Sequence, residues 1–273
     1  MTLNCKGNLV DLSSPKIMGI LNLTPDSFFD GGKYKNEVEI LHQVEKMLKE
    51  GATFIDMGAY SSRPGAEKVT EDEELKRIVP IVQLVLKDFP EAIISIDTFR
   101  SNVAESCLKE GASIINDISA GILDGNMFKL VSKYKSPYIM MHMRGTPQTM
   151  HQQTHYENLL VDILFYFSER IKVARTHKIN DIIVDPGFGF SKSLEQNYEL
   201  LQKLDLLRSL ELPILVGLSR KSMIYKVLES TPQNALNGTT ALNMLALQKG
   251  ANILRVHDVA AAMECIKLNA CFN

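Results

Sequence analysis

Short apolar runs, rich in β-branched residues, recur along the whole chain, and each is nearly continuous in its hydrophobicity. Such runs are typical of parallel strands that are buried on both faces. They cover residues 17–21, 53–57, 93–96, 113–115, 138–141, 182–184, 214–216 and 253–256. The pattern therefore predicts eight parallel strands.

Segments with apolar residues at helical spacing separate these runs. The first is expected to stop at Gly51, and the second begins with an acidic turn, residues 71–74, which suits the positive end of a helix dipole. We expect Ser101 to be the N-cap of a helix that ends at Gly111. Other helical segments are expected around residues 160–171, 200–207, 222–228, 241–247 and 260–268.

Alternating strands and helices, with no linker or low-complexity tract between them, predict an α/β protein with a single (β/α)8 TIM barrel that occupies residues 1–273 as one domain. An open doubly wound sheet is the main alternative. No GxGxxG sequence follows the first strand, which disfavours the dinucleotide-binding form of that fold. The first ten or so residues are expected to cover the barrel floor.

Composition limits the binding partners and the cellular compartment that we expect for this protein. A net charge of −2 gives no reason to expect nucleic acid or an anionic membrane as a partner. The N-terminus lacks the pattern of a signal peptide, and no apolar stretch is long enough to span a membrane, so we expect a cytoplasmic protein. None of the four cysteines forms a CxxC pair, and Cys107 and Cys265 are expected to be buried on helices.

Polar and glycine-rich segments begin where almost every predicted strand ends. They occupy residues 22–32, 58–65, 97, 116–117, 142–145, 185–190, 217–222 and 255–258. In a TIM barrel the carboxyl ends of the strands converge on one rim, where active sites are built. The pattern therefore predicts one site assembled from distant segments.

The chemistry of these segments indicates the kind of ligand. The basic side chains among them are Arg63, Lys221, Arg255 and His257. Arginines bind phosphate or carboxylate oxygens in pairs of hydrogen bonds. Asp97, Asn116 and Asp185 would instead accept N–H groups, such as those of an amino-pyrimidine edge. Together they predict a phosphorylated heterocyclic substrate.

Eight blocks of this sequence resemble the successive signatures of bacterial dihydropteroate synthases, in the order of that family. The blocks are NLTPDSFFDGG, SSRPGA, SIDTFR, INDI, MHMRGTPQTM, DPGFGFSK, GLSRKS and LRVHDV. The resemblance implies a TIM-barrel transferase of folate biosynthesis, usually a homodimer and a target of sulfonamides. Such an enzyme uses Mg2+ and joins 6-hydroxymethyl-7,8-dihydropterin diphosphate to p-aminobenzoate, giving 7,8-dihydropteroate and diphosphate.

The resemblance also implies a role for individual positions. Pterin contacts are expected from Asp97, Asn116, Met140, Asp185 and Lys221. Diphosphate contacts are expected from Asn22, Arg63, Arg255 and His257, with Asn22 also the metal ligand. Positions around p-aminobenzoate are Ser62, Pro64, Phe190, Ser219 and Ser222, and Phe28 and Asp30 belong to the family's mobile first loop. The catalytic residues expected are Asp97, Lys221, Arg255 and His257.

Three positions depart from the commonest family pattern. Tyr60 replaces an acidic residue, Ser62 keeps a hydroxyl but loses a methyl group, and Ser191 stands where glycine is frequent. None of these changes removes a group that the chemistry requires. We expect Mg2+ and the basic residues to stabilise the departing diphosphate, while the amine attacks an already activated carbon.

Simpler interpretations exist for single residues. Asp97 or Asp185 could cap a helix, Arg255 could form a rim salt bridge, and His142 could be a packed histidine. His151 and His155 lack an HExxH context and are expected at the surface.

Two other functions compete with the synthase. One is a corrinoid-linked pterin methyltransferase, and the other is a non-catalytic paralogue that binds pterin or a partner protein. The intact first two loops and the diphosphate-binding residues argue against the methyltransferase. The intact first two loops and Lys221 argue against the paralogue.

Overall fold

Eight parallel strands form the centre of the computed structural model, which describes residues 1–23, 33–60 and 69–272. The strands are β3 (Lys16–Asn22), β4 (Phe54–Gly58), β5 (Ile93–Asp97), β6 (Ile114–Asp117), β7 (Tyr138–Met141), β8 (Ile182–Asp185), β9 (Leu215–Val216) and β10 (Ile253–Val256). Their order is β8-β7-β6-β5-β4-β3-β10-β9, and a parallel bridge between Val184 and Ile214 closes the ring. The predicted eight strands and TIM barrel are confirmed.

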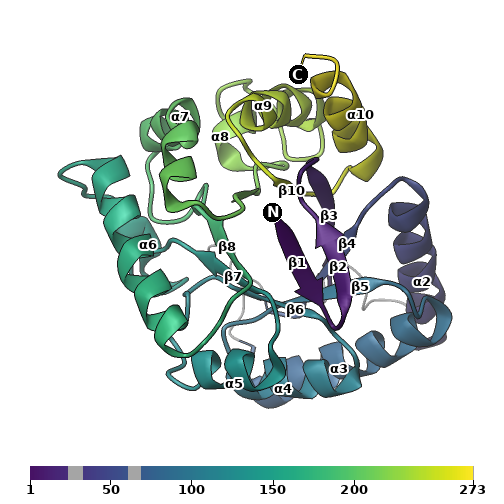
Figure 1. Cartoon of the computed structure of the whole chain (residues 1–273). Coiled ribbons are helices and arrows are strands. Elements are labelled where there is room, and N and C mark those ends of the chain that lie inside the picture. Colours follow the sequence, from purple (N-terminus) through teal and green to yellow (C-terminus); the bar gives the residue numbers. More distant parts are fainter. Residues whose placement is uncertain (24–32, 61–68, 273) are drawn as a thin grey trace.

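Helices surround the strands on the outside (Figure 1). They are α2 (Lys33–Lys49), α3 (Glu71–Asp88), α4 (Ser101–Glu110), α5 (Met127–Tyr134), α6 (Leu159–Thr176), α7 (Leu194–Gln202), α8 (Ser222–Tyr225), α9 (Leu236–Gln248) and α10 (Val259–Asn269), with 3-10 turns η1 (Met150–Gln152) and η2 (Leu204–Leu210). Outward-facing strand residues such as Ile55, Ile115 and Val184 pack with the apolar sides of these helices in one buried cluster. The helix-facing layer is therefore the main core.

The start of α4 differs from the prediction. Arg100, not Ser101, is the N-cap, and its side chain makes no capping bond. The backbone N–H of Ser101 donates instead to Asp124 Oδ2 at 2.7 Å, so a carboxylate from the next loop caps the helix. The helix ends at Gly111 as predicted, with a φ of 117° that favours glycine.

A short N-terminal hairpin closes one end of the barrel. β1 (Thr2–Cys5) pairs with β2 (Asn8–Asp11), and Figure 1 shows them in front of the barrel centre. Lys6 and Gly7 both have positive φ, as the tightest hairpin turns require. The floor cluster comprises Leu3, Cys5, Leu12, Met18, Phe54, Ile114, Ile139, Ile183, Leu215 and Ile253. The prediction that the first residues cover the floor is confirmed.

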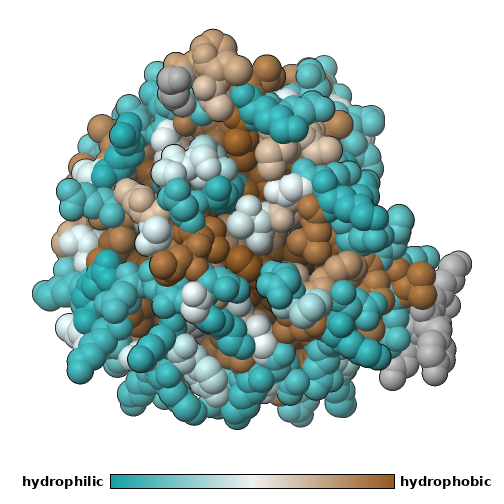
Figure 2. Space-filling view, turned by 45° about the vertical axis from the view of Figure 1, so that its right-hand side comes forward, coloured by the Kyte–Doolittle hydropathy of each residue, from teal (hydrophilic) through white to brown (hydrophobic). Residues whose placement is uncertain are grey.

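Figure 2 shows one face of the molecule, on which hydrophilic side chains predominate and apolar ones form patches between them. None of the helices in the described part of the chain is long and apolar enough to cross a membrane. Cys107 and Cys265 are buried, as expected, and carry free thiols.

Candidate active site

Along the strands, the inward-facing residues change from apolar to polar. On four strands an apolar floor residue is followed two positions later by a polar one: Phe54 and Asp56, Ile114 and Asn116, Ile183 and Asp185, Ile253 and Arg255. Because strand side chains alternate between the two faces, each pair shares the inward side. The polar members lie toward the carboxyl ends of the strands, which we call the mouth of the barrel.

Arg255 lies at the centre of the mouth between two carboxylates. Its Nε donates to Asp56 Oδ2 at 2.6 Å, and its Nη2 donates to Asp97 Oδ2 at 2.7 Å. Asp56 is fully buried and also accepts from Ser95 Oγ at 2.6 Å and Asn116 Nδ2 at 3.1 Å. Burial alone would lower the pKa of Arg255, but the two carboxylates raise it above its ordinary value. The guanidinium is therefore charged and held in a defined plane.

Asp97 is the carboxylate of this group that faces the opening. Its side chain is 25% exposed, whereas that of Asp56 is not exposed at all. Loss of solvation raises the pKa of Asp97 to about 7, with Asp56 contributing in the same direction and Arg255 opposing it. Asp97 can therefore accept N–H groups of a ligand, and its charge is sensitive to the local environment near neutral pH.

Asp185 and Lys221 occupy the neighbouring part of the mouth. Asp185 Oδ1 accepts the backbone N–H of Gly187 at 2.8 Å, and burial raises the pKa of Asp185 against the attraction of Lys221. Lys221 Nζ donates to the carbonyl of Phe188 and lies 5.0 Å from the Phe190 ring centroid. Burial lowers the pKa of Lys221 to about 8, although Asp185 opposes this.

Gly217 lies beside the side chains of both Arg255 and Lys221. A Cβ atom built on Gly217 would lie 3.9 Å from both Arg255 Cβ and Lys221 Nζ, at ordinary contact distance. The Arg255 and Lys221 side chains therefore lie close to one another at the ends of β9 and β10.

Loops after β9 and β10 are joined at the rim. Ser219 Oγ lies 2.9 Å from His257 Nδ1 and accepts the backbone N–H of His257 at 3.2 Å. Arg220 donates to both oxygens of Asp258, at 2.9 and 2.7 Å. Ser222 begins α8 directly after Lys221. The rim pair Ser219–His257 is thus fixed beside the chain that carries Lys221.

One predicted pterin contact is wrong by one residue. Met140 packs in the helix-facing core and is fully buried, because it has the same orientation as Tyr138. Met141 has the inward orientation of Ile139 and lies in a separate apolar cluster that includes Phe190. The methionine on the inner side of β7 is therefore Met141.

Comparisons with known proteins agree with this geometry. The family model described as "Pterin binding enzyme" matches residues 18–257. A dihydropteroate synthase of Haemophilus influenzae is 44% identical over 270 residues, which cover 98% of each chain. The chain belongs to the pterin-binding enzyme family.

Two solved dihydropteroate synthases resemble this pterin-binding enzyme along almost its whole length. The enzyme of Yersinia pestis, in a sulfonamide drug complex, has a TM-score of 0.93 and 40% identity and covers 100% of this chain and 99% of its own. The enzyme of Xanthomonas albilineans, with 4-aminobenzoic acid, has a TM-score of 0.92 and 35% identity and covers 99% and 97%. The similarity extends over the barrel and its mouth.

Several predicted positions of this pterin-binding enzyme lie outside the described residues: Phe28, Asp30, Ser62, Arg63 and Pro64. Asn22 is described and ends β3, where it pairs with Gly58 of β4. Alternation from the floor residue Met18 gives Asn22 the inward orientation. Its amide therefore belongs to the mouth.

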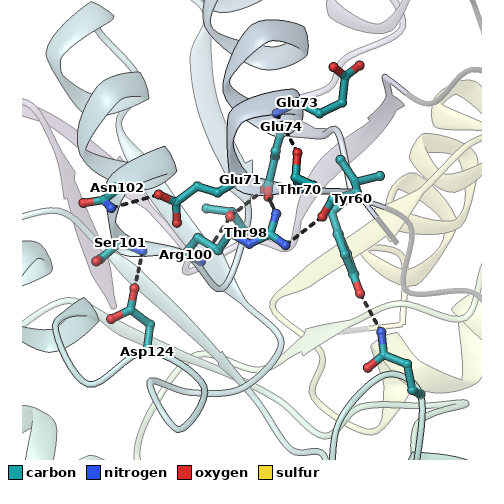
Figure 3. A network of polar contacts seen from close by, with 12 residues as sticks. Tyr60, Thr70, Glu71, Glu73, Glu74, Thr98, Arg100, Ser101, Asn102 and Asp124 are labelled. Carbon is teal, nitrogen blue, oxygen red and sulfur yellow. Dashed lines mark hydrogen bonds and ion pairs between the residues drawn. The ribbon is translucent and has the colours of Figure 1, made fainter. Parts of the chain in front are cut away.

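Tyr60, one of the positions expected to depart from the family pattern, takes part in a polar network (Figure 3). Its hydroxyl accepts from Gln148 Nε2 at 2.9 Å, and the Arg100 guanidinium lies 5.3 Å from its ring centroid. Arg100 also pairs with buried Glu74 and donates to the carbonyl of Val69 at 2.8 Å. Here the tyrosine contributes an aromatic face and a hydroxyl in place of a carboxylate.

Of the histidines outside the rim, His142 is buried and two others, His151 and His155, are exposed. His142 is 1% exposed and lies 3.0 Å from Lys192 Nζ, so it is a packed side chain behind the mouth. His151 and His155 are exposed, as expected. Within the described ranges, no three His, Cys, Asp or Glu side chains form a metal-binding group.

Sequence reasoning missed two residues that shape the site, Asp56 and Lys192. Asp56 lies inside an apolar run, FIDMG, and only its inward orientation distinguishes it. Lys192 closes the DPGFGFSK block, and its burial depends on how that loop folds back.

Proposed function

We propose that this chain is a dihydropteroate synthase, a transferase of folate biosynthesis. It joins p-aminobenzoate to 6-hydroxymethyl-7,8-dihydropterin diphosphate and releases diphosphate. One observation carries the proposal: N–H acceptors and fixed cations converge at the mouth of the barrel. The converging residues are Asp97, Asn116, Asp185, Lys221 and Arg255.

The acceptors suit the pterin. Carboxylate oxygens of Asp97 and Asp185 can accept the N–H groups of its amino-pyrimidine edge, and the Asn116 amide can donate and accept. Asp185 is only 7% exposed and Asn116 only 4%, so hydrogen bonds made here are shielded from water. Negative charge on the two carboxylates would also favour the positive charge that develops on the pterin methylene.

The cations suit the leaving group. Two carboxylates orient the Arg255 guanidinium, which has five N–H donors in a fixed fork. Its remaining donors, with His257 at the rim, would stabilise charge on the departing diphosphate. Since the donors are already oriented, little reorganisation is needed when the C–O bond breaks.

The aminobenzoate side of the mouth includes Phe190 and the rim serines Ser219 and Ser222, next to Lys221, the residue expected to contact the pterin. Lys221 Nζ lies 5.0 Å from the Phe190 ring centroid, so the two side chains are in contact and a flat aromatic acid would pack beside this pair. Its amine attacks a carbon that diphosphate loss has activated. Positioning therefore contributes more than a general base.

Mg2+ is part of the proposal. The ion prefers oxygen ligands and is commonly held by one or two protein groups together with substrate phosphates. The amide oxygen of Asn22, at the mouth end of β3, fits such a site. When bound, the ion would offset negative charge on the diphosphate.

A homodimer and a cytoplasmic location complete the proposal. Exposed apolar side chains on η2, the segment after α8, α9 and α10 support the dimer: Leu206, Val227, Leu228, Leu236, Leu245 and Leu268. Buried together, they would form an apolar interface between two copies. Light scattering on a size-exclusion column measures the mass directly, and a monomer at micromolar concentration would contradict the dimer.

The decisive experiment measures dihydropteroate and diphosphate formation from the two substrates, with and without Mg2+. We expect product only when p-aminobenzoate is present, and loss of turnover when the metal is chelated. Pterin binding without any diphosphate release would favour the non-catalytic paralogue. Methyl transfer to a corrinoid without diphosphate release would favour the methyltransferase.

A further inference from the structure

Lys192 is a buried lysine just behind the mouth. Its side chain is 8% exposed, and its Nζ lies 3.0 Å from His142 Nδ1, 3.0 Å from the Gly187 carbonyl and 3.1 Å from the Phe190 carbonyl. Burial, together with the Lys192 charge, holds the pKa of His142 well below its ordinary value, so the ring is neutral and Nδ1 can accept. Burial lowers the pKa of Lys192 to about 7, against the attraction of Asp185; in its protonated form Nζ has three N–H donors, and each one has an acceptor here.

Two of these acceptors are the ends of one tight turn, residues 187–190. The turn follows a left-handed path that glycine permits, because Gly187 and Gly189 have φ of 71° and 79°, and Ser191 follows with 45°. A Cβ atom on Gly187 would lie 2.1 Å from the carbonyl oxygen of His142. The turn is thus pressed against the end of β7, and Lys192 bridges its first and last carbonyls.

The opposite side of the same turn faces the mouth. The carbonyl of Phe188 accepts from Lys221 Nζ, and the Phe190 ring lies 5.0 Å from that Nζ. The backbone N–H of Gly187 donates to Asp185 at 2.8 Å. Any shift of the turn would therefore move the aromatic ring, the lysine and the carboxylate relative to one another.

We propose that Lys192 is a positioning residue for the aminobenzoate side of the site, an inference that rests on the proposed synthase function. It holds the 187–190 turn from behind, so that the Phe190 ring and the Lys221 ammonium face the acceptor substrate in one geometry. Lys192 acts through the turn and not on the substrate itself.

A double-mutant cycle tests this coupling. Lys192→Met, Phe190→Ala and the double variant are compared with the wild type in steady-state assays at varied p-aminobenzoate. Lys192→Met keeps a long apolar stem but loses the three hydrogen bonds. We expect its KM for p-aminobenzoate to rise about tenfold with a smaller change in kcat, since the binding geometry is lost before the chemistry.

Because Lys192 acts through Phe190, the double variant should lose little more kcat/KM than the worse single variant. Independent losses that multiply in the double variant would overturn the inference. The inference would also be overturned if Lys192→Met had a lower melting temperature and a lower kcat but an unchanged KM, because a purely structural role gives that result. Lys203→Met, at an exposed lysine that pairs with Glu199 on α7, is the matched control and should stay within twofold of the wild type.

Two further outcomes have defined meanings. If circular dichroism shows that Lys192→Met does not fold, Lys192→Gln replaces it in the cycle, because its amide keeps two N–H donors. If the wild type forms no dihydropteroate, the proposed function fails and this inference with it. If the wild type forms dihydropteroate but the losses of the two single variants multiply in the double variant, the proposed function stands and only the role of Lys192 is overturned.

Discussion

The floor and the mouth of the barrel use the same strands and the same inward side, yet they have opposite chemistry. Phe54 and Ile183 belong to a dry cluster that the N-terminal hairpin covers. Asp56 and Asp185, two residues further along the same strands, belong to a charged group around Arg255 and Lys221. On each of these strands, the floor residue and the mouth residue are separated by one two-residue repeat.

This difference shows how the barrel separates stability from function. Each apolar side chain buried at the floor stabilises the folded state by roughly 1.5–3 kcal/mol. Each charge buried at the mouth carries a desolvation cost that its partners only offset. Apolar burial at the floor can therefore offset the desolvation cost of the charged groups that are oriented for a ligand at the mouth. Substitutions at the two ends should change different measured quantities.

The largest effect is expected at the floor, from Phe54→Ala. The variant should lower the free energy of unfolding by about 3–5 kcal/mol, because a fully buried ring leaves a cavity. Urea denaturation measures this change. The kcat/KM of the folded fraction should stay within twofold of the wild type.

Phe165→Ala is the matched control for Phe54→Ala, since the Phe165 side chain is 68% exposed on α6. It should change the free energy of unfolding by no more than about 0.5 kcal/mol. If folded Phe54→Ala lost much of its activity while its stability was unchanged, the inference that the floor serves stability and the mouth serves function would be contradicted.

At the mouth, Arg255→Ala should lower kcat/KM by roughly ten- to a few-hundred-fold. A charge-assisted hydrogen bond contributes roughly 1.5–3 kcal/mol, and the variant also leaves Asp56 and Asp97 without their cation. Steady-state kinetics give the ratio, with exposed Arg208→Ala as the control. Turnover of Arg255→Ala at the wild-type rate would refute the role in diphosphate binding.

A smaller and more specific effect is expected from Asp185→Asn. Replacing one acceptor oxygen by a donor should weaken pterin binding about tenfold, which calorimetry measures. Ile183→Val, on the same side of the same strand, should instead cost roughly 0.5–1.5 kcal/mol of stability and leave pterin affinity unchanged. Equal pterin affinities of Asp185→Asn and the wild type would remove Asp185 from the binding site.

The last effect concerns pH. The folded pKa of Asp97, about 7, lies above its unfolded value of about 4, so the folded state binds this proton more tightly. Stability from this group is complete below the unfolded pKa and is lost as pH rises toward 7. Asp97→Asn should therefore flatten the fall in unfolding free energy between about pH 4 and 7.

Urea titrations at a series of pH values give these curves. Phe54→Ala should lower its whole curve without changing the slope, since no titrating group is removed at the floor. A curve for Asp97→Asn that runs parallel to the wild type would show that the raised pKa makes no contribution to folding.

The fold was largely predictable because its signals are local and repeated. All eight strand predictions were confirmed to within one or two residues at their ends. Helix α5, which has only eight residues, was missed. Ser101 was misassigned because the group that caps α4, Asp124, comes from another loop. A long-range cap leaves no local pattern.

The site was predicted in part. Asp97, Asn116, Asp185, Lys221 and Arg255 were expected to lie together, and they do. Asp56 was missed because its partner Arg255 is 199 residues away in the chain. Without that partner, a carboxylate inside an apolar strand gives no sign of a functional role. The confusion of Met140 with Met141 concerned orientation alone, since a strand's neighbours point to opposite faces.

By itself the sequence determined the alternation of strands and helices and the kinds of group at each strand end, because these depend on neighbouring residues and on composition. Only the tertiary structure decided which inward positions meet, which carboxylate pairs with which cation, and that Lys192 lies behind the 187–190 turn. Those contacts join residues far apart in the chain. Their energies arise from shared burial, which exists only after the barrel has closed.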